Sequence, residues 1–278
     1  MDTESGSYVF TTTTVLLTAM LVSGCYATMP GKRPVQHLSV GTAEIVGNRA
    51  AVSASTDATL PRQEYSSAGE KVPYDMQPNP YTTESGSVPA EARSIFIAAD
   101  NRLQDGDVSG ASAKFRLLTE KYPSLSGPWV RLGVIAEEQE RFSEAIQHYR
   151  KAIAINNKNV NAYMALGLIQ RKQGYFSDAF QTYLNALSVW KDFPEAHLNL
   201  AILYDLYLNN PEAAQKHYEA YYFLTGEKDE KVQKWLVEVR HRTGIDQSFI
   251  DRPPENTVVT ATDVTSAAIS VAAGGDNN

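Results

Sequence analysis

At 278 residues the chain is long enough for one or two domains, and 43% hydrophobic and 21% charged residues are ordinary for a protein that buries a core. A formal net charge of -7 argues against a nucleic-acid partner, because neutralising phosphates takes clustered Lys and Arg. The single cysteine, Cys25, excludes an intrachain disulfide and a cysteine-based zinc site.

Residues 1–24 resemble a signal peptide that runs into this cysteine. The apolar stretch at 15–22 is shorter than the roughly 20 residues that a membrane-spanning helix needs, and it has the size of a signal-peptide core. Residues 21–25 read Leu-Val-Ser-Gly-Cys, which resembles the lipobox of bacterial lipoproteins. The start of the chain departs from the pattern, because it carries Asp2 and Glu4 but no Lys or Arg.

The lipobox resemblance implies a lipid anchor at Cys25. In that family the thiol receives a diacylglycerol, the chain is cleaved before the cysteine, and the new amino group is acylated. The next residue is Tyr26 and not Asp, which by the family's sorting pattern implies the periplasmic face of the outer membrane. Each buried methylene contributes about 0.8 kcal/mol, so several acyl chains hold a protein firmly. The alternative is a free cysteine behind a start that is no signal, in a cytoplasmic protein.

Residues 25–88 are predicted to form a disordered, lipid-anchored tether. Ser, Thr, Ala, Gly and Pro dominate, apolar residues occur singly, and no 3.6-residue period is present. A flexible chain of this length has a root-mean-square reach on the order of 45 Å. The alternatives for 26–88 are a small, weakly patterned domain and an enzyme whose site lies there or is shared with a partner. Six prolines interrupt any helix, namely Pro30, Pro34, Pro61, Pro73, Pro78 and Pro80.

A 34-residue repeat dominates residues 92–228. The repeated set is a bulky residue, Leu and Gly, followed by Ala, an aromatic residue and Ala. One unit has Trp129, Leu132, Gly133, Ala145, Tyr149 and Ala152, and the next has Tyr163, Leu166, Gly167, Ala179, Tyr183 and Ala186. The last unit has one extra residue in the turn at 208–211, where an insertion costs little.

This set resembles the tetratricopeptide repeat, a pair of packed helices. The resemblance covers about 150 of the 278 residues and implies an all-α, right-handed α-solenoid over 89–244. Four repeats are expected at about 92–125, 126–159, 160–193 and 194–228. Gly133 and Gly167 allow the two helices of a unit to approach closely, and Gly106 and Gly174 suit turns that need a positive φ.

A capping helix is predicted at 229–243, followed by a tail. Val232, Trp235, Leu236 and Val239 share one helical face that covers the last exposed core, and Gly244 stops the helix. Residues 245–278 are rich in Pro, Thr, Ala and Gly, which predicts a disordered tail.

No catalytic constellation is present in the sequence, so it predicts a binding protein and not an enzyme, with no cofactor and no metal. His197 takes an aromatic repeat position and is expected to pack, while His148, His217 and His241 are expected on helix surfaces. The acidic run at 137–140 is expected to be a solvated helix face. The Tyr-rich stretch at 218–223 reads as core and cap contact, with a partner surface as the alternative.

Function is therefore expected from a concave groove that the first helix of each repeat lines. A mainly apolar lining with a few polar groups suits an extended peptide or an amphipathic helix of a protein partner. Some family members bind a C-terminal carboxylate with a set of lysine and asparagine side chains. In this sequence only Asn199 and Arg131 occupy comparable positions, so the set is incomplete. The predicted lining residues are Val130, Arg131, Val134, Asn161, Met164, Leu168, Arg171, Lys172, Leu198, Asn199 and Ile202.

The lipobox, the tether and the groove together predict a lipid-anchored periplasmic scaffold or assembly factor for an envelope complex. The architecture resembles the pilotin-like lipoproteins of Gram-negative bacteria, which help a pilus secretin reach the outer membrane. It also resembles repeat lipoproteins that organise cell-wall enzymes or energy-transducing complexes. The alternative is a cytoplasmic adaptor without lipidation.

Overall fold

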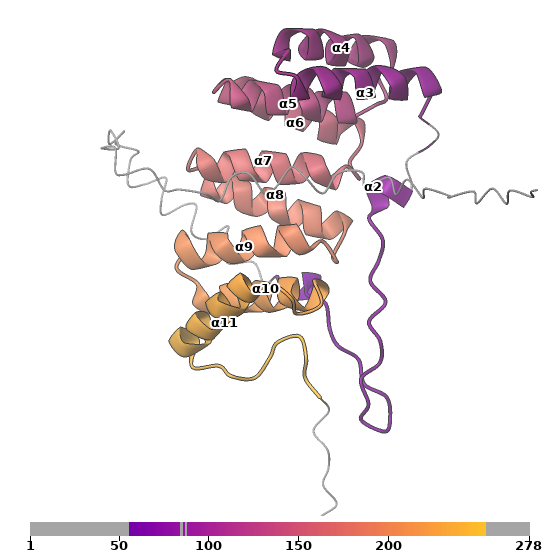
Figure 1. The fold of residues 1–278 in the computed structure, drawn as a ribbon. Helices are drawn as coiled ribbons and strands as arrows, with labels where there is room; N and C mark the ends of the chain where they lie inside the picture. The colour runs from indigo at the N-terminus through magenta and orange to yellow at the C-terminus, as the bar shows by residue number, and fades with distance from the viewer. Residues whose placement is uncertain (1–55, 84–85, 87, 254–278) are drawn as a thin grey trace, which may run out of the picture. The chain divides into compact units, whose positions relative to one another are not determined.

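The computed structural model describes residues 56–83, 86 and 88–253, and the signal-peptide pattern and Cys25 lie outside them. This described part is helical with extended connections, and no strand is assigned within it (Figure 1). None of its helices is long and apolar enough to cross a membrane. The elements are η1 (Asp57–Thr59), α2 (Pro80–Thr83), α3 (Ala90–Gln104), α4 (Val108–Lys121), α5 (Gly127–Glu138), α6 (Phe142–Ile155), α7 (Val160–Lys172), α8 (Phe176–Val189), α9 (Pro194–Leu206), α10 (Pro211–Leu224) and α11 (Glu230–Thr243).

Helices α3 to α10 pack as four consecutive pairs, α3 with α4, α5 with α6, α7 with α8, and α9 with α10. Each pair contacts the next through its second helix, and α11 packs on α10. Figure 1 shows the pairs stacked in chain order. The predicted all-α solenoid of four helix pairs with a capping helix is therefore confirmed.

The turn inside each repeat holds one residue with a positive φ. Gly106 and Gly174 provide it in the first and third repeats, with φ of 82° and 80°. Glu140 and Asn209 provide it in the second and fourth, with φ of 59° and 48°. The first three positions are 34 residues apart and Asn209 comes one residue later, so the extra residue of the fourth repeat lies in this turn.

Side-chain caps fix where several of the helices begin. The side chains of Asp107, Asn159 and Asn210 accept hydrogen bonds from the backbone N–H three residues on, at the starts of α4, α7 and α10. Asp229 does the same for α11. At the other end of α11, Gly244 adopts the left-handed conformation and ends the helix as expected.

Gly133 and Gly167 set the spacing of the two central helix pairs. A Cβ atom built on Gly133 would lie 2.3 Å from the Tyr149 ring, and one on Gly167 would lie 2.4 Å from the Tyr183 ring. Both tyrosines are buried. The expected close approach is therefore confirmed, and the ring that uses the space comes from the second helix of the same repeat.

Residues 56–83, here called the N-terminal strap, correct the predicted extent of the tether. They include η1 and α2, joined by extended chain, and they contact α10, the turn before α9 and the start of α5 (Figure 1). Their side chains contact residues of the folded repeats that are distant in sequence. A local sequence pattern does not reveal such contacts. Residues 25–55 of the predicted tether lie outside the described residues.

Residues 245–253, here called the C-terminal segment, correct the start of the predicted tail in the same way. Ile250 is buried, and the backbone N–H of Gln63 in the strap donates to its carbonyl at 3.0 Å. The two segments that flank the repeats therefore contact each other beside α10. Residues 254–278 lie outside the described residues.

Candidate functional site

The predicted groove residues lie on the first helices of three successive repeats. Helix α5 carries Val130, Arg131 and Val134, α7 carries five of them from Asn161 to Lys172, and α9 carries Leu198, Asn199 and Ile202. Helix α7 contacts both α5 and α9, so the structure brings these residues together in three adjacent rows. The docking groove itself stays a prediction.

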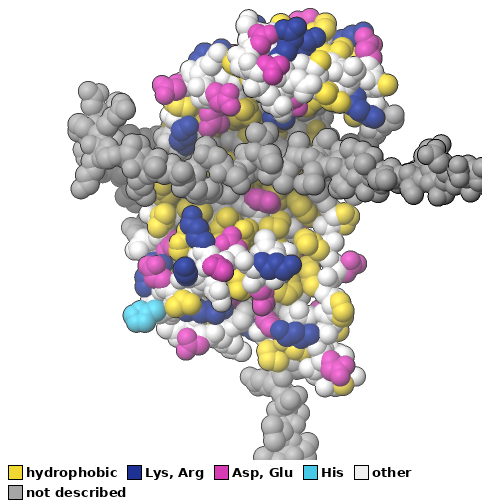
Figure 2. Space-filling view, in the orientation of Figure 1, with side chains coloured by type: hydrophobic (Ala, Val, Ile, Leu, Met, Phe, Trp, Pro, Cys, Tyr) yellow, Lys and Arg dark blue, Asp and Glu magenta, His cyan; other side chains and the backbone are white. Residues whose placement is uncertain are grey.

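The apolar residues of this set are partly or fully covered by neighbouring side chains. Val130 and Val134 are half-buried against the cluster that holds Tyr149. Met164 and Leu198 are half-buried against the larger cluster that spans α7 to α11, and Ile202 is buried within it. In the face that Figure 2 shows, hydrophobic side chains lie between charged ones along the stack. Such a surface combines apolar contact with polar anchoring points.

Two of the three predicted groove cations form ion pairs within the protein. Arg131 approaches the Asp100 carboxylate with two of its nitrogens, at 3.1 and 3.2 Å. Burial raises the pKa of Asp100, and the neighbouring Arg131 opposes that rise. Lys172 lies 3.5 Å from Glu137. Both pairs join first helices of adjacent repeats, so these two cations are already matched to carboxylates within the stack.

Arg171 differs from them, because no described carboxylate forms an ion pair with it. Its Nη2 donates to the Asn199 side-chain oxygen at 3.4 Å, and its buried Nε has no hydrogen-bond partner among the described residues. Asn199 is held in place, since its amide group donates to the Glu195 carbonyl at 2.8 Å. A half-buried guanidinium without a counter-ion favours a carboxylate from outside, which it can bind with two parallel hydrogen bonds.

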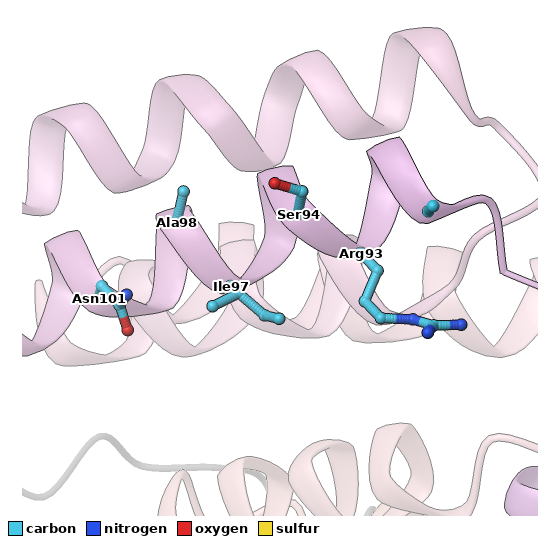
Figure 3. A pocket seen from close by; sticks show the side chains of 6 residues that line it. Arg93, Ser94, Ile97, Ala98 and Asn101 are labelled. Atoms are coloured by element: carbon cyan, nitrogen blue, oxygen red, sulfur yellow. The ribbon is translucent and has the colours of Figure 1, made fainter.

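The outer face of α3 holds a hollow of about 400 Å³. Figure 3 shows Arg93, Ile97 and Asn101 along one edge of α3, with Ser94 and Ala98 beside them. All the lining residues come from this one helix, so the hollow is shallow and open. The hollow lies at the N-terminal end of the stack, on the outer face of the first repeat. The sequence analysis did not predict this hollow.

The histidines are placed partly as predicted. His197 is buried, as expected, and His241 is exposed. The prediction for His217 is wrong, because its side chain is fully buried. The signal was present, since counting the extra residue of the fourth repeat makes His217 equivalent to His148 and to the buried Thr182.

Asp192 holds the middle of the strap. It is fully buried and accepts hydrogen bonds from the Tyr74 hydroxyl at 2.6 Å and from the Gln77 backbone N–H at 2.8 Å. Burial, reinforced by the Asp192 carboxylate, raises the pKa of Tyr74 far above its ordinary value. The indole N–H of Trp190 donates to the Gln77 carbonyl at 2.7 Å. The strap is therefore fixed to the turn between the third and fourth repeats.

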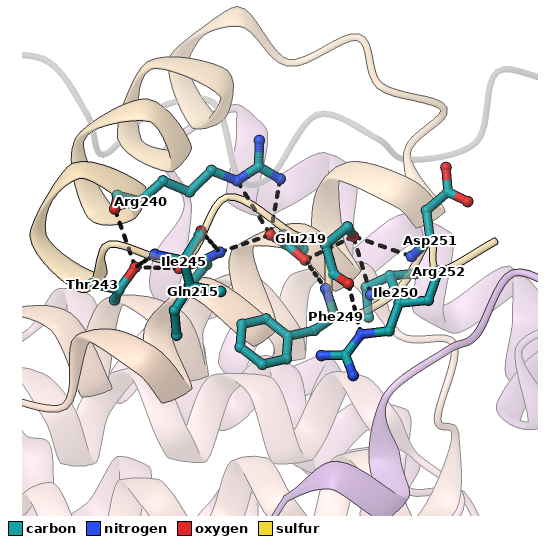
Figure 4. A network of polar contacts seen from close by, with 10 residues as sticks. Gln215, Glu219, Arg240, Thr243, Ile245, Phe249, Ile250, Asp251 and Arg252 are labelled. Atoms are coloured by element: carbon teal, nitrogen blue, oxygen red, sulfur yellow. Dashed lines mark hydrogen bonds and ion pairs between the residues drawn. The ribbon is translucent and has the colours of Figure 1, made fainter. Parts of the chain in front are cut away.

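Glu219 on α10 holds the C-terminal segment (Figure 4). Its carboxylate is buried and accepts from Arg240 at 2.8 Å, from the Gln215 amide at 3.0 Å and from the Ser248 hydroxyl at 2.9 Å. The backbone N–H of Phe249 donates to it at 2.7 Å. Farther along, Asp251 pairs with Lys71 of the strap at 2.5 Å. One buried carboxylate thus accepts hydrogen bonds both from α11 and from the segment that follows it.

Stacked helix pairs repeated every 34 residues, with glycine packed on tyrosine inside a pair, define a helical-repeat solenoid. No group of three or more His, Cys, Asp or Glu residues suited to a metal is present among residues that the structure describes. The chain carries tetratricopeptide repeats, and a family model described as a TPR repeat matches residues 138–174.

Several solved structures are similar to this chain. MamA has 17% sequence identity and a TM-score of 0.47, over 52% of this chain and 84% of that one. PilF of Pseudomonas aeruginosa has 21% identity and a TM-score of 0.49, over 68% and 78%. The tetratricopeptide protein TTC0263 of Thermus thermophilus has 22% identity and a TM-score of 0.45, over 54% and 82%. A search of curated proteins gave no match.

Proposed function

We propose that this protein is a lipid-anchored scaffold at the periplasmic face of the outer membrane, which docks a segment of a partner protein in the groove of its repeats. The observation that carries the docking role is the alignment of half-buried apolar residues with Arg171 on three adjacent first helices. The lipobox pattern at 21–25 supports the anchor. The partner belongs in this proposal to an envelope complex, such as a pilus secretin, a cell-wall enzyme or an energy-transducing assembly.

The polar groups of the groove favour a partner segment that carries a carboxylate among apolar residues. Arg131 and Lys172 already face carboxylates of this chain, whereas no carboxylate of the described residues pairs with Arg171. Leu168 lies three residues before Arg171, on the same side of α7. An Asp or Glu with an apolar neighbour one turn away matches this pair of residues, because guanidinium and carboxylate groups bind each other bidentately.

Substitution in the groove tests the docking role. Leu168→Asp places a charge where the proposal puts apolar contact, and the fold tolerates it better than a fully buried site would. Recovery of the copurified partner from detergent-solubilised envelopes should fall at least about tenfold, a loss of roughly 1.4 kcal/mol. Gln181→Asp on the exposed face of α8 is the matched control and should leave recovery unchanged.

Arg171→Gln should weaken the same partner about five- to tenfold while leaving the helical spectrum unchanged. Equal recovery of partner by wild type, Leu168→Asp and Arg171→Gln, with all three folded by circular dichroism, would contradict the proposed groove.

Metabolic labelling with radioactive palmitate tests the anchor separately. Wild-type protein should take up label and sediment with the outer membrane, and Cys25→Ser should do neither. Unlabelled wild-type protein that still binds its partner would instead favour the cytoplasmic adaptor.

A further inference from the structure

A chain of buried polar groups connects the N-terminal strap to the core of the fourth repeat. The Thr56 hydroxyl lies 2.7 Å from His217 Nε2, and His217 Nδ1 lies 2.9 Å from His197 Nδ1. His197 Nε2 lies 2.8 Å from the Lys191 carbonyl oxygen. Thr56, His197 and His217 are all buried. Thr56, the first residue of the strap, therefore contacts a hydrogen-bonded pair of buried histidines through His217.

The carbonyl at the inner end fixes the direction of every hydrogen bond in this chain. A carbonyl only accepts, so His197 carries its proton on Nε2 and presents a lone pair at Nδ1. His217 must then donate from Nδ1, which leaves its Nε2 as an acceptor for the Thr56 hydroxyl. The docked strap thus requires both imidazoles to be neutral, each in one tautomer.

Additional protons are incompatible with this arrangement. Two imidazolium rings would point N–H groups at each other across the 2.9 Å between the Nδ1 atoms, with the ring centroids 5.2 Å apart. One added proton on His197 reverses the next bond, so that His217 Nε2 donates to Thr56 and the hydroxyl must turn its own proton away from the histidine. It also leaves a buried positive charge, which is costly without a counter-ion.

The charged neighbours of the pair are engaged elsewhere. On the turn before α9, Asp192 accepts from Tyr74 and Gln77 of the strap. On α10, Lys216 lies 3.1 Å from Asp57 of η1 and 3.2 Å from Glu212, and its charge disfavours a proton on His217. On α9, the Tyr204 ring stacks on His217 at 5.8 Å, and the Tyr204 hydroxyl shares a side-chain hydrogen bond with Thr56. No carboxylate on these elements forms an ion pair with either histidine in the described structure.

The strap residue Thr56 is the hydrogen-bond partner at the outer nitrogen of His217, so moving the strap away opens that nitrogen to water. We propose that the N-terminal strap is an acid-released latch: protonation of the His197 and His217 pair frees residues 56–77 from the fourth repeat while the helix pairs stay folded. The inference is independent of the groove and of the lipid anchor.

The direction of the pH dependence follows from burial. Burial lowers the pKa of His197 to about 4, and burial followed by the His197 charge lowers the pKa of His217 well below its ordinary value. The strap covers His217 Nε2, so the docked state binds fewer protons at His217 than the released state does. Docking is strongest above about pH 6.5, the ordinary pKa of histidine, and weakens as the pH falls towards 4. Each proton taken up weakens docking by up to about tenfold per pH unit.

Hydrogen–deuterium exchange of the full chain tests the latch, with rates corrected for the intrinsic effect of pH. Between pH 7 and pH 5, protection of the amides at 57–77 should fall at least about tenfold, while protection in α5 to α8 changes less than about twofold. In His217→Gln the strap should show no such fall, because a glutamine side chain does not titrate. His241→Gln, on the exposed part of α11, should behave as wild type.

Three outcomes would overturn the latch. These are strap protection that does not change with pH in the wild type, joint loss of protection in the strap and all helices, or an unchanged fall in His217→Gln. If His217→Gln does not fold, Thr56→Val provides the second route, since it removes only the hydroxyl that the pair holds. It should lower strap protection at pH 7 about tenfold with the repeats intact, and retention of full protection would again count against the latch.

Discussion

The two ends of the helix stack are finished in opposite ways. At the first repeat, the outer face of α3 presents Ser94 and Asn101, which are exposed among the described residues, and the half-buried Ala98 (Figure 3). At the last repeat, α10 is covered by α11, by the C-terminal segment and by the start of the strap. One end is made compatible with water by its residues, and the other is covered by additional chain.

The repeat register explains the difference. Positions equivalent to Ala98 hold buried leucines in the later repeats, and positions equivalent to Asn101 hold Ile135, Ile169 and Leu203, also buried. The first repeat therefore replaces the apolar residues of an internal junction with small or polar ones. The last repeat keeps large buried residues such as Tyr218 and must cover them, because a solenoid exposes its core at an end without a cap.

The largest expected effect comes from placing the same charge at each end. Leu236 on α11 is 3% exposed and Ile97 on α3 is 53% exposed. Leu236→Asp buries an unpaired carboxylate and should lower the free energy of unfolding by at least about 4 kcal/mol. Ile97→Asp should change it by less than about 0.5 kcal/mol. Urea denaturation followed by circular dichroism measures both.

A similar loss of stability in the two variants would show that another part of the protein covers the outer face of α3. A small effect of Leu236→Asp would show that α11 does not cap the core. Either result breaks the contrast between the open end and the covered end.

A smaller effect is expected where the C-terminal segment is attached. Glu219→Gln removes a buried carboxylate that accepts from α11, from Ser248 and from the Phe249 backbone. The free energy of unfolding should fall by about 2–3 kcal/mol, since hydrogen bonds to a charged group are the stronger kind. Amides at 248–251 should lose protection first in hydrogen exchange.

Glu230→Gln, at an exposed site on α11, is the matched control for this substitution and should be neutral. Full protection of the C-terminal segment in a folded Glu219→Gln variant would mean that contacts of Ile250 hold the segment instead.

The repeats could be predicted from sequence because their evidence is local and recurs. Gly133 with Tyr149 and Gly167 with Tyr183 are separated by 16 residues in each case, within one period, so one repeat supports the reading of the next. The positive φ at Glu140 was not predicted, since glutamate gives no sign of it, although the 34-residue register links that position to Gly106 and Gly174.

The strap and the C-terminal segment could not be predicted in this way. Thr56 and His217 are 161 residues apart, and Tyr65 and Asp251, which also share a hydrogen bond, are 186 apart. Each contact is a single pair that no period repeats, in segments whose composition is typical of disorder. The groove rows followed from the register, whereas the ion pairs that occupy Arg131 and Lys172 required the packed neighbours.

The smallest effect is expected from a substitution that weakens the strap alone and leaves α11 and the C-terminal segment in place. Asp192→Asn keeps one acceptor oxygen for Tyr74 or Gln77 but turns an N–H₂ group towards the other donor. Strap docking should weaken about five- to tenfold, or roughly 1 kcal/mol, with the helical signal unchanged. Lower protection of the amides at 74–77 should report it, and Asp178→Asn on the exposed side of α8 should have no effect.

Tyr74→Phe combined with Asp192→Asn should weaken strap docking by less than the sum of the two single effects, because both substitutions remove the same hydrogen bond. Additive losses would show that Tyr74 and Asp192 act on the strap independently, and the hydrogen bond from Trp190 to Gln77 would then be the next contact to remove.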